Sequence, residues 1–350
     1  MQIALEISNL DFTRPTGISR YMIELINEFS KDNSDKITLY YKLSRLSNRL
    51  KANKSKFTFQ GYDEHFWKVF RQPQIIHGLD TITPKIGSAR RVTTIHDVFV
   101  LHSNAELVSS KEFSQRKKRQ FQRSADYSDV ILTVSETSRR DLLSAIKVSE
   151  KKVMVTHLGV NPNFQPAQKH EINEMKKRLG IAEEYLLFVG ELSIRKNSSR
   201  LVQAFVNSGL DIQLILAGKC SFGGEHTVQL MNKLSKDSKI LWLNYVSDKD
   251  LPILYTGARG FVFPTLYEGF GLPVLEAMAC KTPVLVGNRG AGMEISGGLA
   301  TSCDPYNLDS ISEGIQNLLV QSRYGLREKS LDFTWEKCAR KTKDIYKNLI

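Results

Sequence analysis

Short apolar runs alternate with segments of helical periodicity through the first half of the chain. The first run is followed by a loop and then by residues 17–31, GISRYMIELINEFSK, whose apolar side chains recur at helical spacing. Further helices are predicted at 110–125 and 137–145. The runs predicted to be strands are 2–7, 37–41, 75–76, 92–95 and 130–134. This alternation predicts a parallel sheet with helices on both faces.

A second series of the same kind begins after the polar segment 161–169. Its predicted strands are 185–189, 212–217, 240–243, 260–263 and 284–286. Its predicted helices are 198–208, 226–236, 248–257, 273–279 and 308–321. The chain of 350 residues is long enough for two cores, so we expect Rossmann-like domains at 1–165 and 166–332 and a terminal helix at 333–350. No GxGxxG dinucleotide fingerprint follows the first strand.

Composition places the protein among ordinary globular chains, with 41% hydrophobic residues. The sequence contains no apolar run of about 18 residues, and its start lacks the basic and then apolar build of a signal peptide. We therefore expect a cytoplasmic protein. The four cysteines are scattered without CxxC spacing, which argues against a zinc site and a disulfide framework.

Positive charge is concentrated in the first half. The formal net charge is +12, of which +10 falls in residues 1–170 and +2 in the remainder. Segments 42–56 and 111–123 each carry six basic side chains, against no acidic side chain and one, respectively. Such runs are often solvated faces, but they also suit an anionic surface, either phospholipid or nucleic acid.

The stretch 265–283, TLYEGFGLPVLEAMACKTP, combines two carboxylates, a glycine turn and a helix start. An apolar run ending at Pro264 predicts a buried strand before it, and Pro273 suits the first position of a helix. Amides of the turn would then open that helix and accept a phosphate or a sugar hydroxyl. Glu268 precedes the turn and Glu276 is placed in the first turn of the helix. A nucleotide sugar fits such a pocket.

This stretch and three segments before it resemble the retaining glycosyltransferases of family 4, which have the GT-B fold. The resemblance rests on FVFPTLYEGFGLPVLEAMACKTPV, with seven residues between Glu268 and Glu276, and on LLFVGELSIRKN, LILAGK and NYVSDKDLPILYTGA. It covers nearly all of the second half and, more thinly, the first. It implies two Rossmann-like domains facing a central cleft, with a C-terminal helix that crosses back to the N-terminal, acceptor-side domain.

The resemblance also implies roles for individual residues. Arg195 and Lys196 would hold the donor diphosphate and neutralise the charge that builds on it as the glycosidic bond breaks. Glu268 would bind hydroxyls of the transferred sugar, and Glu276 those of the donor ribose, neither acting as a nucleophile. The other donor-binding positions implied are Gly190, Phe270, Gly271 and Leu272.

In the first half, the resemblance assigns His96, directly after a predicted strand, to the donor sugar as part of the catalytic set. The alternative for His96 is a core or loop histidine fixed by its neighbouring carboxylate. Asp97 is a possible acceptor contact, and His77 is expected either at the acceptor side or in a structural role. Gly17 would approach the donor phosphate through its backbone, with Arg20 near the same anion or the acceptor.

The expected activity is retaining transfer from a nucleotide sugar to a glycan or lipid-linked acceptor, at the cytoplasmic face of a membrane. TIHD, RKN and FTWEK are most similar to bacterial mannosyltransferase-like members, which makes GDP-mannose the first donor to consider. We expect no cofactor and no metal, because Arg195, Lys196 and backbone amides would meet the phosphates, and we expect no nucleic-acid partner. The alternatives are a UDP-sugar donor, a sugar-nucleotide epimerase, a basic nucleic-acid-binding protein and an inactive donor-binding subunit.

Overall fold

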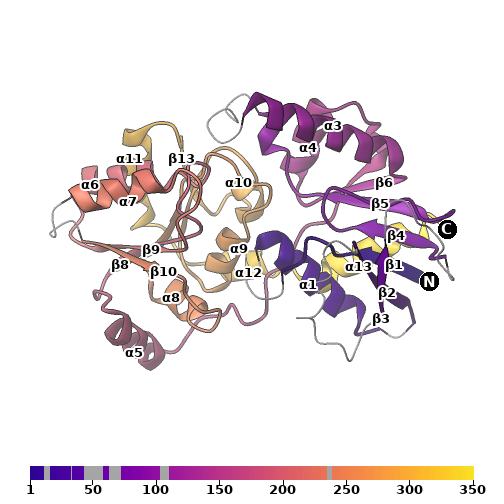
Figure 1. Ribbon diagram of the computed structural model, residues 1–350. Coiled ribbons are helices and arrows are strands. Elements are labelled where there is room, and N and C mark those ends of the chain that lie inside the picture. Colours follow the sequence, from indigo (N-terminus) through magenta and orange to yellow (C-terminus); the bar gives the residue numbers. More distant parts are fainter. Residues whose placement is uncertain (12–15, 33, 43–57, 63–71, 103–109, 235–238) are drawn as a thin grey trace. The chain divides into compact units, whose positions relative to one another are not determined.

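The computed structural model describes residues 1–350 except 12–15, 33, 43–57, 63–71, 103–109 and 235–238 (Figure 1). The chain forms two compact units. The first takes in the described residues from Met1 to Gly159 together with Thr334–Ile350, and the second spans Val160–Phe333. The second unit thus begins a few residues before the predicted boundary at 165, and the terminal helix is part of the first unit.

The first unit is built on a seven-stranded parallel sheet of order β3-β2-β1-β4-β5-β6-β7. Leu5 of β1 lies opposite Leu39 of β2 and His77 of β4, so the apolar first strand occupies the middle of the sheet. Such burial on both faces explains why the central strands read as continuous apolar runs. The strands are β1 (Gln2–Glu6), β2 (Lys36–Lys42), β3 (Thr58–Tyr62), β4 (Ile75–Gly78), β5 (Arg90–Ile95), β6 (Val130–Thr133) and β7 (Val153–Val155).

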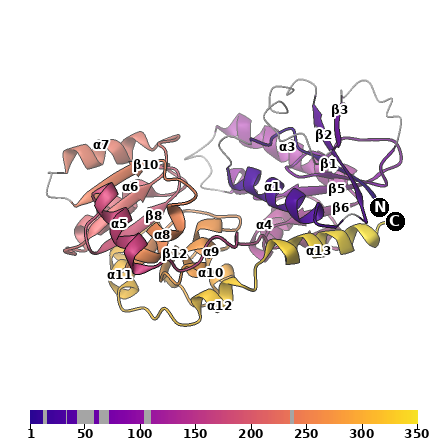
Figure 2. The same ribbon diagram turned by 90° about the horizontal axis from the view of Figure 1, so that it is seen from below.

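Helices cover both faces of this sheet. α1 packs against α13 on one face, while α3 and α4 lie together on the other (Figures 1 and 2). Thr16 caps α1, because its hydroxyl accepts a hydrogen bond from the Ser19 amide at 3.3 Å. The helical elements are α1 (Gly17–Phe29), η2 (Phe99–Leu101), α3 (Lys111–Tyr127), α4 (Glu136–Ala145), η4 (Glu150–Lys152) and α13 (Trp335–Lys347).

The second unit contains a six-stranded parallel sheet of order β10-β9-β8-β11-β12-β13. Its centre is aromatic: the rings of Phe261 and Phe263 stack at 5.2 Å between centroids, and Phe188 of the neighbouring strand lies 5.9 Å from Phe263. The strands are β8 (Tyr185–Val189), β9 (Gln213–Ala217), β10 (Ile240–Asn244), β11 (Gly260–Phe263), β12 (Val284–Gly287) and β13 (Thr301–Cys303).

Two helical layers enclose that sheet. One consists of α6, α7 and α11, and the other of α5, α8, α9, α10 and α12, with neighbours in each layer in contact (Figure 1). No helix within the described ranges is both long and apolar enough to cross a membrane. The helices are α5 (Lys169–Leu179), α6 (Ser198–Asn207), α7 (Glu225–Lys233), α8 (Leu251–Gly257), α9 (Leu272–Ala279), α10 (Gly292–Ser296), α11 (Leu308–Leu318) and α12 (Leu326–Ser330).

The sequence prediction missed three of the four edge strands and the short or polar helices. These edge strands, β3, β7 and β13, have three to five residues with exposed or half-buried positions among them, so no apolar run marks them. Helices α5, α10 and α12 were also not predicted. α5 lies in a strongly polar segment, and α10 and α12 have five residues each, too few to show a helical period.

Candidate active site

The site of the second unit lies where its strand order reverses, between β8 and β11. In open parallel sheets, the loops at the carboxyl ends of two such strands form the ligand-binding crevice. Here those loops are residues 190–197 and 264–271, and they are joined by a hydrogen bond from the Leu266 amide to the Arg195 carbonyl at 3.0 Å. The residues expected to bind the donor are therefore brought together from segments about 70 residues apart in sequence.

Asn197 fixes the geometry of these loops. Its side-chain amide donates to the carbonyl oxygens of Pro264 at 2.9 Å and Pro305 at 2.7 Å, and only 3% of the residue is exposed. Its backbone has a φ of 60°, in the left-handed region that asparagine tolerates better than most residues. Asn197 is the N-cap residue of α6, so it fixes the point at which the loop carrying Lys196 ends and the helix begins. The sequence prediction gave Asn197 no role, although an asparagine just before a predicted helix was a usable signal.

Two glycines let the loops after β8 and β9 approach closely. Gly190 and Gly218 have φ values of 154° and 150°. A Cβ atom on Gly218 would lie 1.9 Å from the carbonyl oxygen of Gly190, so only glycine fits there. Gly190 also donates its amide hydrogen to the Ala217 carbonyl at 2.9 Å. Gly190, predicted to bind the donor, is thus part of a contact between two backbone segments at the carboxyl ends of β8 and β9.

Lys196 and Glu268 form an ion pair with little solvent access. The Nζ atom of Lys196 lies 2.7 Å from Oε1 of Glu268, and their side chains are 12% and 11% exposed. The ammonium group also lies 4.8 Å from the centre of the Phe263 ring, a cation–π contact at the end of β11. Nη1 of Arg195 is 3.8 Å from the same carboxylate oxygen, and its side chain is 34% exposed. Both predicted cations therefore converge on one carboxylate.

The electrostatics of this group favour an anionic ligand. Burial lowers the pKa of Lys196; the Glu268 carboxylate acts against that shift, and the neighbouring Arg195 charge reinforces it. Two cations share one carboxylate, so the cluster has an excess of one positive charge when all three groups are ionised. A bound phosphate group would balance that excess in a poorly hydrated place, where charge-assisted hydrogen bonds are strong.

The second carboxylate belongs to α9, which begins one residue earlier than expected. Pro273 is its second residue rather than its first, because Gly271 caps the helix with a φ of 97°. Glu276 consequently lies beyond the first turn, which corrects the prediction. It is 6% exposed and accepts a hydrogen bond from the Tyr255 hydroxyl at 3.1 Å. Phe270, immediately before the cap, packs edge-on against Phe333 with ring centres 6.0 Å apart.

The first unit has a separate group of candidate residues at the carboxyl ends of β4 and β5. His96 follows β5, and its Nε2 lies 3.0 Å from the Leu79 carbonyl oxygen after β4. Because a carbonyl only accepts hydrogen bonds, Nε2 carries the hydrogen. The imidazole also packs edge-on against Tyr21, with ring centres 4.9 Å apart. His96 is thus held by a backbone carbonyl and an aromatic ring rather than by the neighbouring carboxylate.

The other predicted residues of this unit have local backbone roles. Asp97 accepts a hydrogen bond from the Phe99 amide at 3.1 Å and so holds the turn that leads into η2. Gly17 is the first residue of α1 and is exposed, as expected for a helix start. Arg20 is half-buried one turn into that helix, and its amide donates to the Thr16 carbonyl at 2.8 Å.

His77 is a core residue with a structural role, not an acceptor-side residue. Its side chain is completely buried, with Nδ1 2.5 Å from the Tyr346 hydroxyl and Nε2 2.7 Å from the Thr94 hydroxyl. Burial, together with nearby His96, lowers the pKa of His77 to about 3. Both ring nitrogens therefore have protein partners, and the ring is neutral at physiological pH.

The sequence contains one Asp-x-Asp spacing, Asp248 and Asp250, although no Asp-x-Asp motif of the kind that holds a nucleotide-bound metal is expected. Asp250 pairs with Arg178 at 2.5 Å and accepts a hydrogen bond from the Ser247 hydroxyl at 2.8 Å, at the start of α8. It therefore has a structural role there. Across the described residues, no group of three or more His, Cys, Asp or Glu side chains is arranged to hold a metal ion.

Comparison with known proteins agrees with the fold. Residues 171–333 match the model of glycosyl transferases group 1, and residues 15–164 match glycosyltransferase family 4. Together the two matches span most of the chain. The fold and these matches therefore define an enzyme, a glycosyltransferase of the GT-B class. The chain belongs to the family 4 glycosyltransferases.

Individual relatives are similar over long stretches. The chain is 28% identical to O-antigen chain mannosyltransferase B of Escherichia coli, over 95% of this chain and 96% of that protein. It is 23% identical to the serotype-specific mannosyltransferase WbdA of Escherichia coli, over 71% of this chain and 32% of that protein. A crystal structure of HepE from Anabaena in complex with UDP-glucose superposes with a TM-score of 0.76 at 16% identity, over 99% of this chain and all of that one. The last comparison concerns the fold alone.

Proposed function

We propose that this glycosyltransferase moves a sugar, with mannose from GDP-mannose as the first candidate, to a glycan or lipid-linked acceptor with retention of configuration. The observation that carries the proposal is the convergence of Lys196 and Arg195 on Glu268 at the carboxyl ends of β8 and β11. Donor diphosphate would accept hydrogen bonds from both cations. Glu268, released from its ion pair, would accept hydrogen bonds from hydroxyls of the transferred sugar.

The reaction step follows from these charges. The bond between the anomeric carbon and the diphosphate oxygen breaks, and its electron pair stays on the diphosphate, where Lys196 and Arg195 stabilise the new charge. The acceptor hydroxyl oxygen bonds to the anomeric carbon on the same face, and its proton passes to the leaving phosphate oxygen. No covalent intermediate forms on Glu268, whose carboxylate is assigned to hydroxyls of the transferred sugar and not to its anomeric carbon.

Binding of the nucleoside is assigned to the neighbouring elements. Glu276 would accept hydrogen bonds from the ribose hydroxyls, with its second oxygen held by Tyr255. Amides at the start of α9 have no acceptor within the helix, so Gly271 and Leu272 can donate to sugar or phosphate oxygens, with Phe270 as the third member of that turn. Gly190 lets the backbone after β8 approach the diphosphate.

In the first unit, His96 is assigned to a sugar hydroxyl. Its Nε2 hydrogen is engaged by Leu79, so in the neutral ring Nδ1 is the nitrogen that accepts a hydrogen bond. Gly17 and Arg20, at the start of α1, are assigned to a phosphate or an acceptor group. Asp97, whose carboxylate also holds the turn before η2, is assigned to an acceptor contact.

Donor identity is tested by a panel of nucleotide sugars. The mannosyltransferase relatives favour GDP-mannose, whereas the UDP-glucose complex of the HepE structure keeps UDP-sugars as the alternative. We expect GDP-mannose to raise the melting temperature and to be hydrolysed slowly without acceptor, and Lys196→Ala to abolish hydrolysis. Lys233→Ala, at an exposed position of α7, is the control. Binding without turnover would indicate a donor-binding subunit, and isomerisation of the donor would indicate an epimerase.

We also propose that the first unit docks on an anionic membrane through α3. Arg116, Arg119 and Arg123 are exposed and spaced by three and four residues, so they project from one side of the helix, while Phe121 and Ala125 face the core. At the end of the helix, exposed Tyr127 has the Arg91 guanidinium 5.7 Å from its ring centre.

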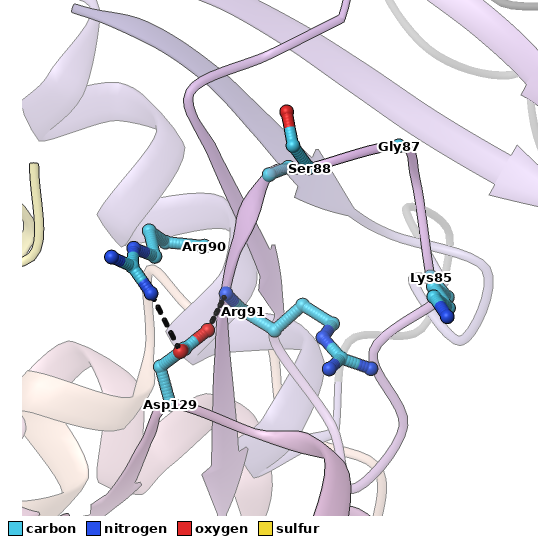
Figure 3. Close-up of a pocket in the computed structure, with 7 residues that line it drawn as sticks. Lys85, Gly87, Ser88, Arg90, Arg91 and Asp129 are labelled. Carbon is cyan, nitrogen blue, oxygen red and sulfur yellow. Dashed lines mark hydrogen bonds and ion pairs between the residues drawn. The ribbon is translucent and has the colours of Figure 1, made fainter.

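A shallow polar pocket continues this basic surface. Lys85, Ser88, Arg90, Arg91 and Asp129 line it at the amino ends of β5 and β6 (Figure 3). Asp129 binds Arg90 at 3.3 Å and the Arg91 amide at 2.8 Å, while the Arg91 side chain extends toward Lys85 (Figure 3). Three basic side chains and one carboxylate line the pocket, and only Arg90 pairs its side chain with that carboxylate, so the pocket suits phosphate headgroups. Of the predicted run 42–56, only Lys42, the last residue of β2, lies within the described residues.

Vesicle binding tests this surface. Each basic residue near an anionic membrane contributes about 1 kcal/mol, so reversing Arg116, Arg119 and Arg123 to Glu should weaken binding to phosphatidylglycerol vesicles by at least roughly two orders of magnitude. Lys169→Glu with Lys177→Glu, exposed on α5 of the second unit, is the matched control. Equal binding by both variants would refute the assignment. Tighter, salt-sensitive binding to an oligonucleotide than to vesicles would instead indicate a nucleic-acid partner.

A further inference from the structure

A chain of buried polar side chains crosses the core of the first unit. The Tyr346 hydroxyl lies 2.5 Å from Nδ1 of His77, whose Nε2 lies 2.7 Å from the Thr94 hydroxyl. The same Thr94 hydroxyl lies 2.9 Å from the hydroxyl of Tyr21. All four side chains have no measurable solvent exposure. These side chains come from α13, β4, β5 and α1. Three hydrogen bonds therefore connect the last helix of the protein, α13, to the first, α1.

This series of hydrogen-bonded side chains ends next to His96. The ring of Tyr21 meets the His96 imidazole edge-on, with an interplanar angle of 79°. The Leu79 carbonyl fixes the other side of that imidazole through Nε2. Rotation of His96 is therefore limited by two contacts, and one of them depends on where the Tyr21 ring is held. Tyr21 is in turn fixed by its hydroxyl at Thr94.

Packing alone does not require polar groups at these positions. Removing four such groups from water costs free energy that their hydrogen bonds only offset, and apolar side chains of similar shape would fill the space as well. Directional hydrogen bonds instead select one arrangement of the groups that make them. Neutral His77 is suited to the middle of the chain, because it donates from one ring nitrogen and accepts at the other.

We propose that Tyr346 is a positioning residue, which acts through His77, Thr94 and Tyr21 to orient His96 for its sugar hydroxyl. The C-terminal helix α13 is then part of the support of the active site as well as a packing element. The inference rests on the proposed role of His96 in binding the sugar. Whether Tyr346 orients His96 can nevertheless be measured without any substrate.

The test is Tyr346→Phe, which keeps the ring and removes only the hydroxyl. The imidazole resonances of His96, followed by NMR in 15N-histidine-labelled protein, should shift. The kcat for transfer should fall roughly fivefold, as expected for one lost hydrogen bond, with little change in KM. In a His96→Ala background the same substitution should cause no further fall, because its effect passes through His96. Thr94→Val, which breaks the chain at its middle, should act in the same way if Tyr346→Phe folds poorly.

Tyr62→Phe is the matched control. It also removes one buried tyrosine hydroxyl from this unit, one that donates to Glu6 at 2.8 Å, but it does not touch the chain to His96. We expect it to lower the melting temperature comparably and to leave the His96 resonances in place. Unshifted His96 resonances in Tyr346→Phe, or losses that multiply with His96→Ala, would overturn the inference. If the wild-type protein used no nucleotide sugar, the proposed function would fail. The His96 resonances would still decide whether the hydrogen-bonded series from Tyr346 to Tyr21 holds His96 in place.

Discussion

Replacing Lys196 by methionine removes one charge from the buried group at the carboxyl ends of β8 and β11 while keeping an unbranched side chain of similar length. Lys196 and Arg195 are the two cations proposed to stabilise the leaving diphosphate. Loss of one such preorganised donor typically lowers turnover by a factor of about 10² to 10³. We therefore expect kcat for transfer, and for donor hydrolysis, to fall by that factor.

Stability should fall as well, for a separate reason. Breaking a buried ion pair typically costs about 3–5 kcal/mol, because one charge is left without its partner. Here Arg195 remains 3.8 Å from Glu268, and burial already offsets much of the ion pair by disfavouring the charged form of Lys196, so we expect a smaller loss, at most about 1 kcal/mol. Chemical denaturation measures it. In the double variant Lys196→Met with Glu268→Gln, both charges are gone, so most of the stability should return while transfer stays lost.

The contributions of Lys196 to stability and to transfer activity should depend on pH in opposite directions. Burial lowers its pKa in the folded protein, so between that lowered pKa and the ordinary value of the unfolded chain the unfolded state binds more protons. The difference in unfolding free energy between the wild type and Lys196→Met should therefore grow as pH rises through that alkaline window. Transfer activity should decline over the same window, because the neutral amine no longer stabilises the diphosphate.

Two results would refute this reasoning. Transfer by Lys196→Met within threefold of the wild type would show that the ammonium group does not act on the leaving diphosphate. Recovery of activity along with stability in the double variant would show that the first loss came from a disturbed fold. Lys233→Met, an exposed replacement on α7, controls for the substitution itself and should change neither quantity.

Further predictions concern the donor, the backbone and metals. Glu276→Gln keeps an acceptor for Tyr255 but loses the charge, so the KM for the donor should rise about 10-fold or more with kcat little changed; a fall in kcat alone would contradict ribose binding. Lys281→Gly should stabilise the protein by about 0.5–1 kcal/mol in chemical denaturation, because Lys281 has a φ of 60° that glycine adopts without strain. The same change at Lys177, exposed within α5, should destabilise by about 1 kcal/mol. Transfer should survive dialysis against EDTA, and a loss restored by a divalent cation would disprove metal-independent catalysis.

The sequence by itself determined the features that depend on local order. β8 and β11 occur at the predicted residues because a buried parallel strand must be a continuous apolar run between loop residues. The basic and acidic side chains that follow them could be identified because functional loops come directly after such strands. The start of α1 at Gly17 was also predicted from local periodicity.

Only the tertiary structure decided which side chains meet. The pairing of Lys196 with Glu268 joins residues 72 apart, and the bond from His77 to Tyr346 joins residues 269 apart. No local pattern distinguishes His77 from His96, since both follow apolar runs in strands or at strand ends. Packing of α13 against α1 closes the core over His77, whereas His96 lies beyond the end of β5. Long-range packing decides burial, and burial separates a structural histidine from one that can meet a ligand.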